Sequence, residues 1–279
     1  MPLRLVEGVC HPHAASNADG WFADSESAVL LDGATPSASI TVSPRVNDTV
    51  WLVQRFLELW PTLQAAGAAE RAELARIALR DELEGWCAKA GATPDEGPFA
   101  CLAIAHVTGA RLELLNMGDL TLLSRAHDGS VQRLGESAVR ELDRRAIEGL
   151  ARALAAGVAP HAERLRSIAP ELARNRKLRN VLPGYEVFEP SVSCLGRFQR
   201  WVCARDDVRS LLLMSDGFYR LVDTFAVYDD LSLFDAVERR GLASLLDALR
   251  AIEVADADCV RHPRFKMHDD ATALWLELS

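Results

Sequence analysis

Hydrophobic and polar residues alternate along this chain in blocks that predict groups of strands separated by pairs of helices. Strand-like runs occupy residues 3–10, 20–33, 99–107, 110–118, 120–126, 185–194, 200–204, 209–217 and 271–278. Apolar residues spaced three and four apart predict helices within 43–60, 68–91, 136–180 and 221–256. This order predicts an α+β fold, a four-layer α/β/β/α sandwich in which helices flank two central antiparallel sheets.

Individual residues predict where several of these elements begin, end or pair. Asn47 or Asp48 would cap the first helix, and Gly91 would end the second. The three strand-like runs within 99–126 are joined by short links, so we expect them to form an antiparallel meander. The last strand, 271–278, is apolar on both faces except at its penultimate residue, which predicts a position inside the layered core.

The chain shows no internal repeat or low-complexity linker, so we expect one domain over residues 1–279. Its most insertion-like part is the helical region at about 136–180, which Pro160 and Pro170 are expected to break. Residues 133–180 contain eleven Arg or Lys against six Asp or Glu. This basic stretch is either a solvated helix face or a surface that attracts a phosphorylated partner.

Composition and charge argue against several classes of protein. Hydrophobic residues make up 49% of the 279 residues, which is typical of a soluble globular chain. The net charge of −9 argues against nucleic acid as a ligand. We find no apolar run of bilayer-spanning length and no signal peptide, and the six cysteines are scattered. We therefore expect a cytoplasmic protein with free thiols and no membrane contact.

Five aspartates share one local pattern, in which an acidic residue stands at the end or start of a hydrophobic strand. They are Asp19, Asp32, Asp119, Asp216 and Asp269. One Asp-Gly pair alone is typical of a hairpin corner, and the pair at Asp32 is open to that interpretation. Strand ends that meet at one sheet edge would instead gather several carboxylates, whose mutual repulsion a hard divalent cation removes.

Such a carboxylate site suits metal-assisted hydrolysis of a phosphate ester, because divalent ions activate water and neutralise phosphoryl charge. The chain has no Cys-x5-Arg loop, no Gly-x-Ser-x-Gly elbow and no P-loop. An alternative is an amidohydrolase-like His-x-His metal pair at His11 and His13. The other five histidines do not lie at positions that would complete such a metal site. The favoured interpretation of the His-x-His pair is therefore a loop near the entrance of the carboxylate site.

The ordered motifs "NADG", "VLLDGA", "LELLNMGDLTLLSR", "LLLMSDGFYRLV" and "DDATALWLEL" resemble those of the metal-dependent protein serine/threonine phosphatases, the PPM or type 2C family, in a divergent bacterial-type form. The match runs in order over almost the whole chain. The resemblance implies two central antiparallel sheets between helices and a site for two Mn²⁺ or Mg²⁺ ions, with a possible weak third.

Further roles follow from the resemblance. Asp32 would bridge both metals and position the attacking water, and the Gly33 carbonyl would bind one ion. Asp19, Asp216 and Asp269 would be further metal ligands, and Asp119 would belong to the weak third site. The implied activity is hydrolysis of phosphoserine, phosphothreonine or another phosphate monoester, on a phosphorylated protein or a small phosphate ester.

The chain departs from the family pattern at four positions. Ala18 replaces a glutamate, Ala14 a phosphate-binding arginine, Ala34 a histidine that can act as general acid, and Arg220 a further acidic residue. We predict that His13 serves as general acid and that Arg220 contacts the phosphate. The alternative is a catalytically weak pseudophosphatase that binds metal and acts as a regulatory module for a phosphorylated partner.

Overall fold

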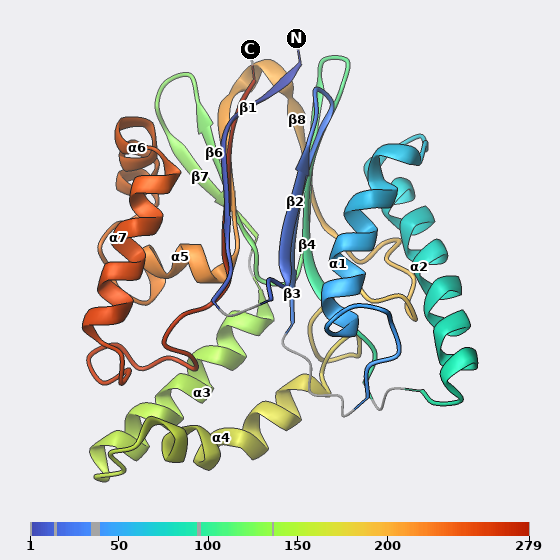
Figure 1. Ribbon diagram of the computed structural model, residues 1–279. Coiled ribbons are helices and arrows are strands. Elements are labelled where there is room, and N and C mark those ends of the chain that lie inside the picture. Colours follow the sequence, from blue (N-terminus) through green and yellow to red (C-terminus); the bar gives the residue numbers. More distant parts are fainter. Residues whose placement is uncertain (1, 14–15, 35–39, 94–95, 136, 279) are drawn as a thin grey trace.

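The computed structural model describes residues 2–13, 16–34, 40–93, 96–135 and 137–278. Within these residues the strands form two five-stranded antiparallel sheets that pack face to face (Figure 1). Helices lie on both outer faces, so the predicted α+β sandwich is confirmed. The two ends of the chain lie side by side, at the end of the sandwich away from α3 and α4 (Figure 1).

The first sheet has β9 (Val208–Met214) at its centre, with the C-terminal strand beside it. Its spatial order is β1 (Leu3–His11), β10 (Ala271–Leu278), β9 (Val208–Met214), β6 (Thr121–Ala126) and β7 (Val131–Leu134). Its outer face carries α5 (Asp216–Asp223), α6 (Asp230–Arg240) and α7 (Leu242–Ala255) (Figure 1). β10 lies between β1 and β9, which confirms the predicted interior position of this strand.

The second sheet has the order β2 (Asp19–Ala23), β3 (Ser27–Gly33), β4 (Ala100–Thr108), β5 (Arg111–Met117) and β8 (Gln199–Ala204). Its outer face carries α1 (Asp48–Leu59), the short 3-10 helix Trp60–Thr62, and α2 (Ala68–Ala90). The predicted cap is confirmed, because the Asn47 side chain accepts a hydrogen bond from the Val50 N–H at 2.8 Å. Gly91 ends α2 with a φ of 62°.

The space between the sheets is filled mainly by leucines from both inner faces. Leu30, Leu114, Leu122, Leu213 and Leu276 belong to this buried cluster, and all five are almost completely shielded from solvent. Each alternates with residues that face an outer helix layer, as the pleat requires. This interior fixes the register of the strands and so the positions of the residues at their ends.

Two further helices, α3 (Ala138–Ala155) and α4 (His161–Arg176), pack against each other below one end of the sandwich (Figure 1). They fall within the predicted helical region 136–180. Pro160 precedes α4, but Pro170 lies inside it, so the prediction that Pro170 breaks the helix is wrong. Pro170 is on an exposed face, while Ile168 packs on Ala146 and Leu150 of α3 and holds the helix across the proline.

Two strand predictions need correction, and one strand was not predicted. The run at 120–126 does not continue a meander, because β6 crosses to the first sheet and pairs with β9, while β8 takes the free edge of β5. Residues 185–194 form no named strand among the described residues and make an isolated bridge from Phe188 to Ala100. The short strand β7 was not predicted. It pairs with β6 across the turn that contains Gly129.

No helix in the described part of the chain is long and apolar enough to cross a bilayer. All six cysteines are free. The single-domain organisation and the insertion-like nature of residues 136–180 stay predictions.

Candidate metal centre

The Asp-Gly pair at the end of β3 belongs to a paired strand end. Asp32 lies directly opposite Asp19 across the antiparallel β2–β3 pair. The hairpin turn is at the other end of these strands, where the Asp24 carboxylate accepts hydrogen bonds from the N–H groups of Glu26 and Ser27, at 2.9 and 2.7 Å. The interpretation of Asp32 as a hairpin corner is therefore wrong, and two carboxylates stand side by side.

Asp19 has one carboxylate oxygen without a partner among the described residues. The side chain is buried, and its Oδ2 accepts a hydrogen bond from the Thr272 hydroxyl at 2.8 Å, whereas Oδ1 accepts none. A buried acceptor that has left water and found no donor costs free energy. A cation bound at Oδ1 would remove that cost.

Two glycines allow close approach of the backbone at this end of the sandwich. A Cβ atom at Gly33 would lie 2.5 Å from the carbonyl oxygen of Ala18 and 2.6 Å from Cγ2 of Thr49. A Cβ atom at Gly217 would lie 1.9 Å from the carbonyl oxygen of Asp270. Glycine is therefore required where β3 meets β2 and where α5 meets the segment before β10.

Asp216 and Asp269 reach the same end of the sandwich from the first sheet. The Ser215 N–H donates to the Thr272 carbonyl, and the Thr272 N–H donates to the Ser215 hydroxyl oxygen, both at 2.9 Å. Because the Thr272 hydroxyl also bonds Asp19, this residue ties the end of β9 to the start of β2. The structure thus brings strand ends that are far apart in sequence to one place.

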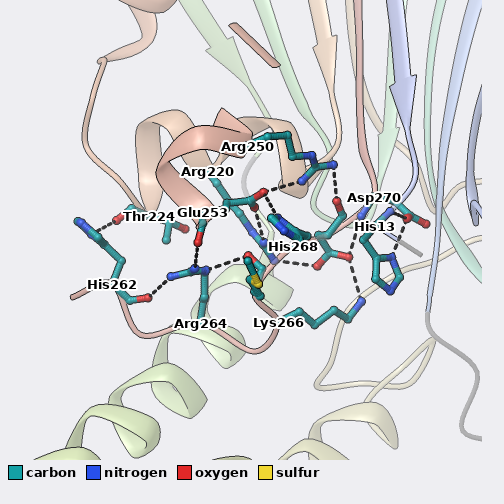
Figure 2. A network of polar contacts seen from close by, with 12 residues as sticks. His13, Arg220, Thr224, Arg250, Glu253, His262, Arg264, Lys266, His268 and Asp270 are labelled. Atoms are coloured by element: carbon teal, nitrogen blue, oxygen red, sulfur yellow. Dashed lines mark hydrogen bonds and ion pairs between the residues drawn. The ribbon is translucent and has the colours of Figure 1, made fainter. Parts of the chain in front are cut away.

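Asp269 differs from the other predicted ligands because cations hold both of its oxygens. Its Oδ2 pairs with Nη2 of Arg220 at 2.8 Å, and its Oδ1 pairs with Nζ of Lys266 at 2.9 Å. Arg220 also pairs with the fully buried Glu253 at 3.0 Å, and Figure 2 shows these residues within one continuous polar network. Arg250 completes the network, with one contact to Glu253 at 2.6 Å.

Asp119 lies in the turn between β5 and β6 and is buried. It accepts a hydrogen bond from the Cys101 thiol at 3.0 Å, and its backbone carbonyl accepts one from Arg140 at 2.8 Å. A cavity of about 780 Å³ opens beside it and is also lined by Asp216 and Asp143. Helix α3 therefore contributes an acidic side chain, Asp143, to the surroundings of the predicted site.

Burial and mutual repulsion raise the pKa values of most of these carboxyls. Burial, and after it the charges of Asp19 and Asp216, raise the pKa of Asp32 well above its usual range. Burial and Asp269 raise the pKa of Asp216 to about 7. For Asp269 burial acts in the same direction, but the nearby charges of Arg220 and Lys266 outweigh it and lower its pKa.

The remaining predicted site residues have definite surroundings. His13 donates its backbone N–H to Oδ1 of Asp270 at 2.8 Å, and its Nδ1 lies 2.7 Å from the same oxygen. The Ala18 N–H donates to Oδ2 of Asp270 at 2.8 Å, and the Ala34 N–H donates to the Phe99 carbonyl at 3.1 Å. Ala14 lies outside the described residues. The catalytic roles of His13 and Arg220 stay predictions.

Four residues near the site were missed by sequence reasoning, namely Asp143, Glu253, Lys266 and Asp270. Asp270 was recognised only as a neighbour of Asp269, although it orients both His13 and the Ala18 amide. Asp143 stands among mixed charges on a helix and carries no local signal. Glu253 pairs with Arg220, which is distant in sequence, whereas Lys266 pairs with Asp269 only three residues away, a spacing that the sequence already shows.

The donor set suits a hard divalent cation. It consists of carboxylate oxygens with the Gly33 carbonyl nearby, which Mg²⁺ and Mn²⁺ prefer, and the unpartnered Oδ1 of Asp19 lies within it. Among the described residues no three His, Cys, Asp or Glu side chains are already gathered around a single point. Asp19, Asp32 and Asp216 fit the expected ions. Asp269 fits them only if Arg220 and Lys266 move away from its carboxylate oxygens.

A sequence model of the protein phosphatase 2C family matches residues 20–251. The chain belongs to the protein phosphatase 2C family. The matched segment includes Asp32, Asp119 and Asp216, whereas Asp19 and Asp269 lie outside it. No curated protein sequence matches the chain.

Solved structures of bacterial phosphatases share the fold at low sequence identity. The serine/threonine phosphatase PstP of Mycobacterium tuberculosis superposes with a TM-score of 0.56 at 16% identity, covering 100% of both chains. The catalytic domain of PstP in complex with two manganese ions gives 0.54 at 16%, covering 99% of this chain and 98% of that one. Stp1 of Staphylococcus aureus gives 0.55 at 14%, covering 99% and 96%.

Proposed function

We propose that this protein is a metal-dependent phosphatase that hydrolyses phosphoserine, phosphothreonine or another phosphate monoester. The observation that carries the proposal is the position of Asp19 directly opposite Asp32, with Asp216 near enough for its charge to act on both, in a chain of the protein phosphatase 2C family. A cluster of carboxylates with raised pKa values is a site built for cations.

Asp19, Asp32, Asp216 and the Gly33 carbonyl would hold Mn²⁺ or Mg²⁺, with Asp269 as a further ligand and Asp119 at a weak third site. Bound ions would supply an activated water and neutralise charge on the phosphoryl oxygens. Asp32 would orient the ions and the water. Its register opposite Asp19 is consistent with this role.

His13 is the candidate proton donor to the departing ester oxygen. Asp270 accepts a hydrogen bond at Nδ1, which leaves Nε2 as the atom that would carry the transferred proton. The His13 side chain is about one third exposed, so a substrate can reach it. The charge of His13 also lowers the pKa of Asp269, which places the ring near the carboxylates.

Arg220 was predicted to contact the phosphate. It lines the cavity of about 780 Å³, but its guanidinium already pairs with Asp269 and Glu253. Positioning Asp269 is therefore the better-supported role. This cavity is also lined by Arg133, Arg140 and Arg261, whose charges would favour a phosphorylated protein or a small phosphate ester.

Hydrolysis of p-nitrophenyl phosphate by the full chain tests the proposal. We expect activity that requires Mn²⁺ and is lost in Asp32→Asn. Asp81→Asn is a matched control, because it makes the same chemical change on the exposed face of α2. Absence of Mn²⁺-dependent hydrolysis would overturn the proposal.

The second candidate is a pseudophosphatase that binds metal and a phosphorylated partner without turnover. Ala18, Ala34 and the cations on Asp269 favour it. It predicts no hydrolysis but a rise in melting temperature with Mn²⁺, which Asp32→Asn abolishes.

A further inference from the structure

Two positive side chains enter the carboxylate cluster on one side only. Arg220 and Lys266 occupy both oxygens of Asp269. Burial and the charge of Asp269 raise the pKa of Asp216, and the charges of Arg220 and Lys266 oppose that rise, so both cations also act on Asp216. Burial acts to lower the pKa of Lys266, but the charge of Asp269, followed by those of Asp216 and Asp32, raises it, so the ammonium lies near several of these carboxylates. Fixed cations at this place compete with a metal ion for the same carboxylate.

Arg220 cannot easily turn away from Asp269, because its other end is anchored in the core. Its side chain is only 8% exposed, and Nη1 pairs with Glu253, which is 0% exposed. Glu253 is held in turn by Arg250 at 2.6 Å and by His268 at 2.7 Å, as Figure 2 shows. Glu253 thus fixes the guanidinium in place and is itself held by two further charged or titratable groups.

Asp19, which begins β2 of the second sheet, has no such partner. Its Oδ2 accepts from the Thr272 hydroxyl, and its Oδ1 accepts from no described residue. No ion pair is recorded between Asp19 or Asp32 and a Lys, Arg or His among the described residues. A divalent ion that binds to Asp19 and Asp32 therefore has no ion-paired side chain to displace.

We propose that the positive charges of Arg220 and Lys266 substitute for the charge of one of the two expected metal ions. The cluster therefore binds one Mn²⁺ tightly, beside Asp19 and Asp32. It binds a second Mn²⁺ much more weakly, beside Asp216 and Asp269. The inference rests on the proposed function and specifies how the same site is loaded. The weaker ion has to displace the cations from Asp269 and bear their repulsion. We expect its affinity to be about 100-fold lower than that of the first ion.

Titration of the metal-free full chain with Mn²⁺ tests this inference, by calorimetry together with electron paramagnetic resonance of the free ion. Wild type should show one tight ion and one ion about 100-fold weaker. Lys266→Met removes one cation from a side chain that is 36% exposed, so folding is not at risk. This variant should strengthen the second ion by about 10-fold and leave the first unchanged.

Lys89→Met is the matched control, since Lys89 is exposed on α2 and stacks on Trp86. It should change neither affinity. Arg220→Met is a second test, with circular dichroism to verify folding, and should strengthen the second ion at least as much as Lys266→Met.

Two equally tight ions in wild type, or a second affinity that Lys266→Met and Arg220→Met leave unchanged, would overturn the inference while leaving the proposed phosphatase intact. No Mn²⁺ binding and no hydrolysis would instead refute the proposed function, and the inference with it. The number of bound ions and their affinities therefore distinguish failure of this inference from failure of the proposed function, without relying on activity.

Discussion

Asp19 and Asp269 lie at the same end of the sandwich, each next to the start of a strand, yet their surroundings are opposite. Asp19 is buried with one unpartnered oxygen, and burial and neighbouring carboxylates raise its pKa well above its usual range. Asp269 is held by Arg220 and Lys266, and its pKa is lowered. One side of the cluster therefore needs a cation from solution, while the other has been supplied with cations by the chain itself.

This difference separates residue type from residue function. An aspartate at a strand end is a potential metal ligand in both cases, but its electrostatic surroundings decide how readily it accepts an ion. The following variants test the contrast, and they are ordered by the size of the expected effect.

Asp32→Asn removes the carboxylate that stands next to Asp19, on the side without cations. We expect kcat/KM for p-nitrophenyl phosphate with Mn²⁺ to fall on the order of 10³-fold, equivalent to about 4 kcal/mol, because ion binding and water activation are lost together. Asp269→Asn should retain one tight Mn²⁺, which calorimetry measures. Equal loss of tight binding in both variants would remove the contrast between the two sides.

Glu253→Gln breaks the anchor on the cation side. The change leaves Arg220 and Arg250 without their buried carboxylate, so the free energy of unfolding should fall by about 3 kcal/mol in urea. Glu277→Gln is the control, because Glu277 pairs with Arg4 at an exposed position and should cost less than about 1 kcal/mol. Similar losses in both variants would argue that the Glu253 network is not special.

Gly33→Ala tests the close approach of β3 to the segment before β2. The new Cβ would meet the Ala18 carbonyl oxygen and Cγ2 of Thr49, so we expect a loss of about 2 kcal/mol and weaker Mn²⁺ binding. Gly85→Ala provides a control of opposite sign. Nothing lies within 4 Å of its Cβ in helix α2, and alanine should stabilise by about 0.5–1 kcal/mol. Thermal unfolding with chelator present measures both.

Asp143→Asn gives the smallest effect and depends on pH. Burial, followed by the charges of Asp119, Asp216 and Asp269, raises the pKa of Asp143 to about 8. Between the ordinary aspartate pKa of about 4 and this value, the unfolded chain binds fewer protons than the folded one, so stability falls as pH rises. The asparagine variant should gain about 1 kcal/mol at pH 8 in the presence of chelator and nothing at pH 4.

The exposed Asp247→Asn on α7 is the control for this pH dependence and should behave as wild type at both pH values. A pH-independent gain in Asp143→Asn would show that the carboxyl does not feel the neighbouring aspartates. Helix α3 would then play no part in the electrostatic difference between the Asp19 side and the Asp269 side of the cluster.

The basic stretch at 136–180 illustrates how a charge count can mislead. Arg144 and Arg145 on α3 pair with Glu141 of the same helix, so part of the positive charge is compensated on an exposed face. Arg140 instead turns inward to the Asp119 carbonyl. Binding of a phosphorylated partner by this region stays a prediction.

The sequence by itself determined most of the layers and the positions of the candidate ligands. Strand and helix periods are local, and Asp-Gly pairs at strand ends are visible without any contact, so Asp19, Asp32 and Asp216 could be found from the pattern alone. The swap of β6 into the first sheet could not be found, because a short link fits either a hairpin or a crossing between sheets.

Only the tertiary structure decided which charges meet. Arg220 lies 33 residues from Glu253 and 49 from Asp269 in sequence, and Asp143 comes to the site on a separate helix. These neighbours arise when the two sheets close on each other, and the Coulomb interaction depends on distance in space and on burial. A sequence records each charge but not its partner, so it revealed the carboxylates and concealed the cations that distinguish one side from the other.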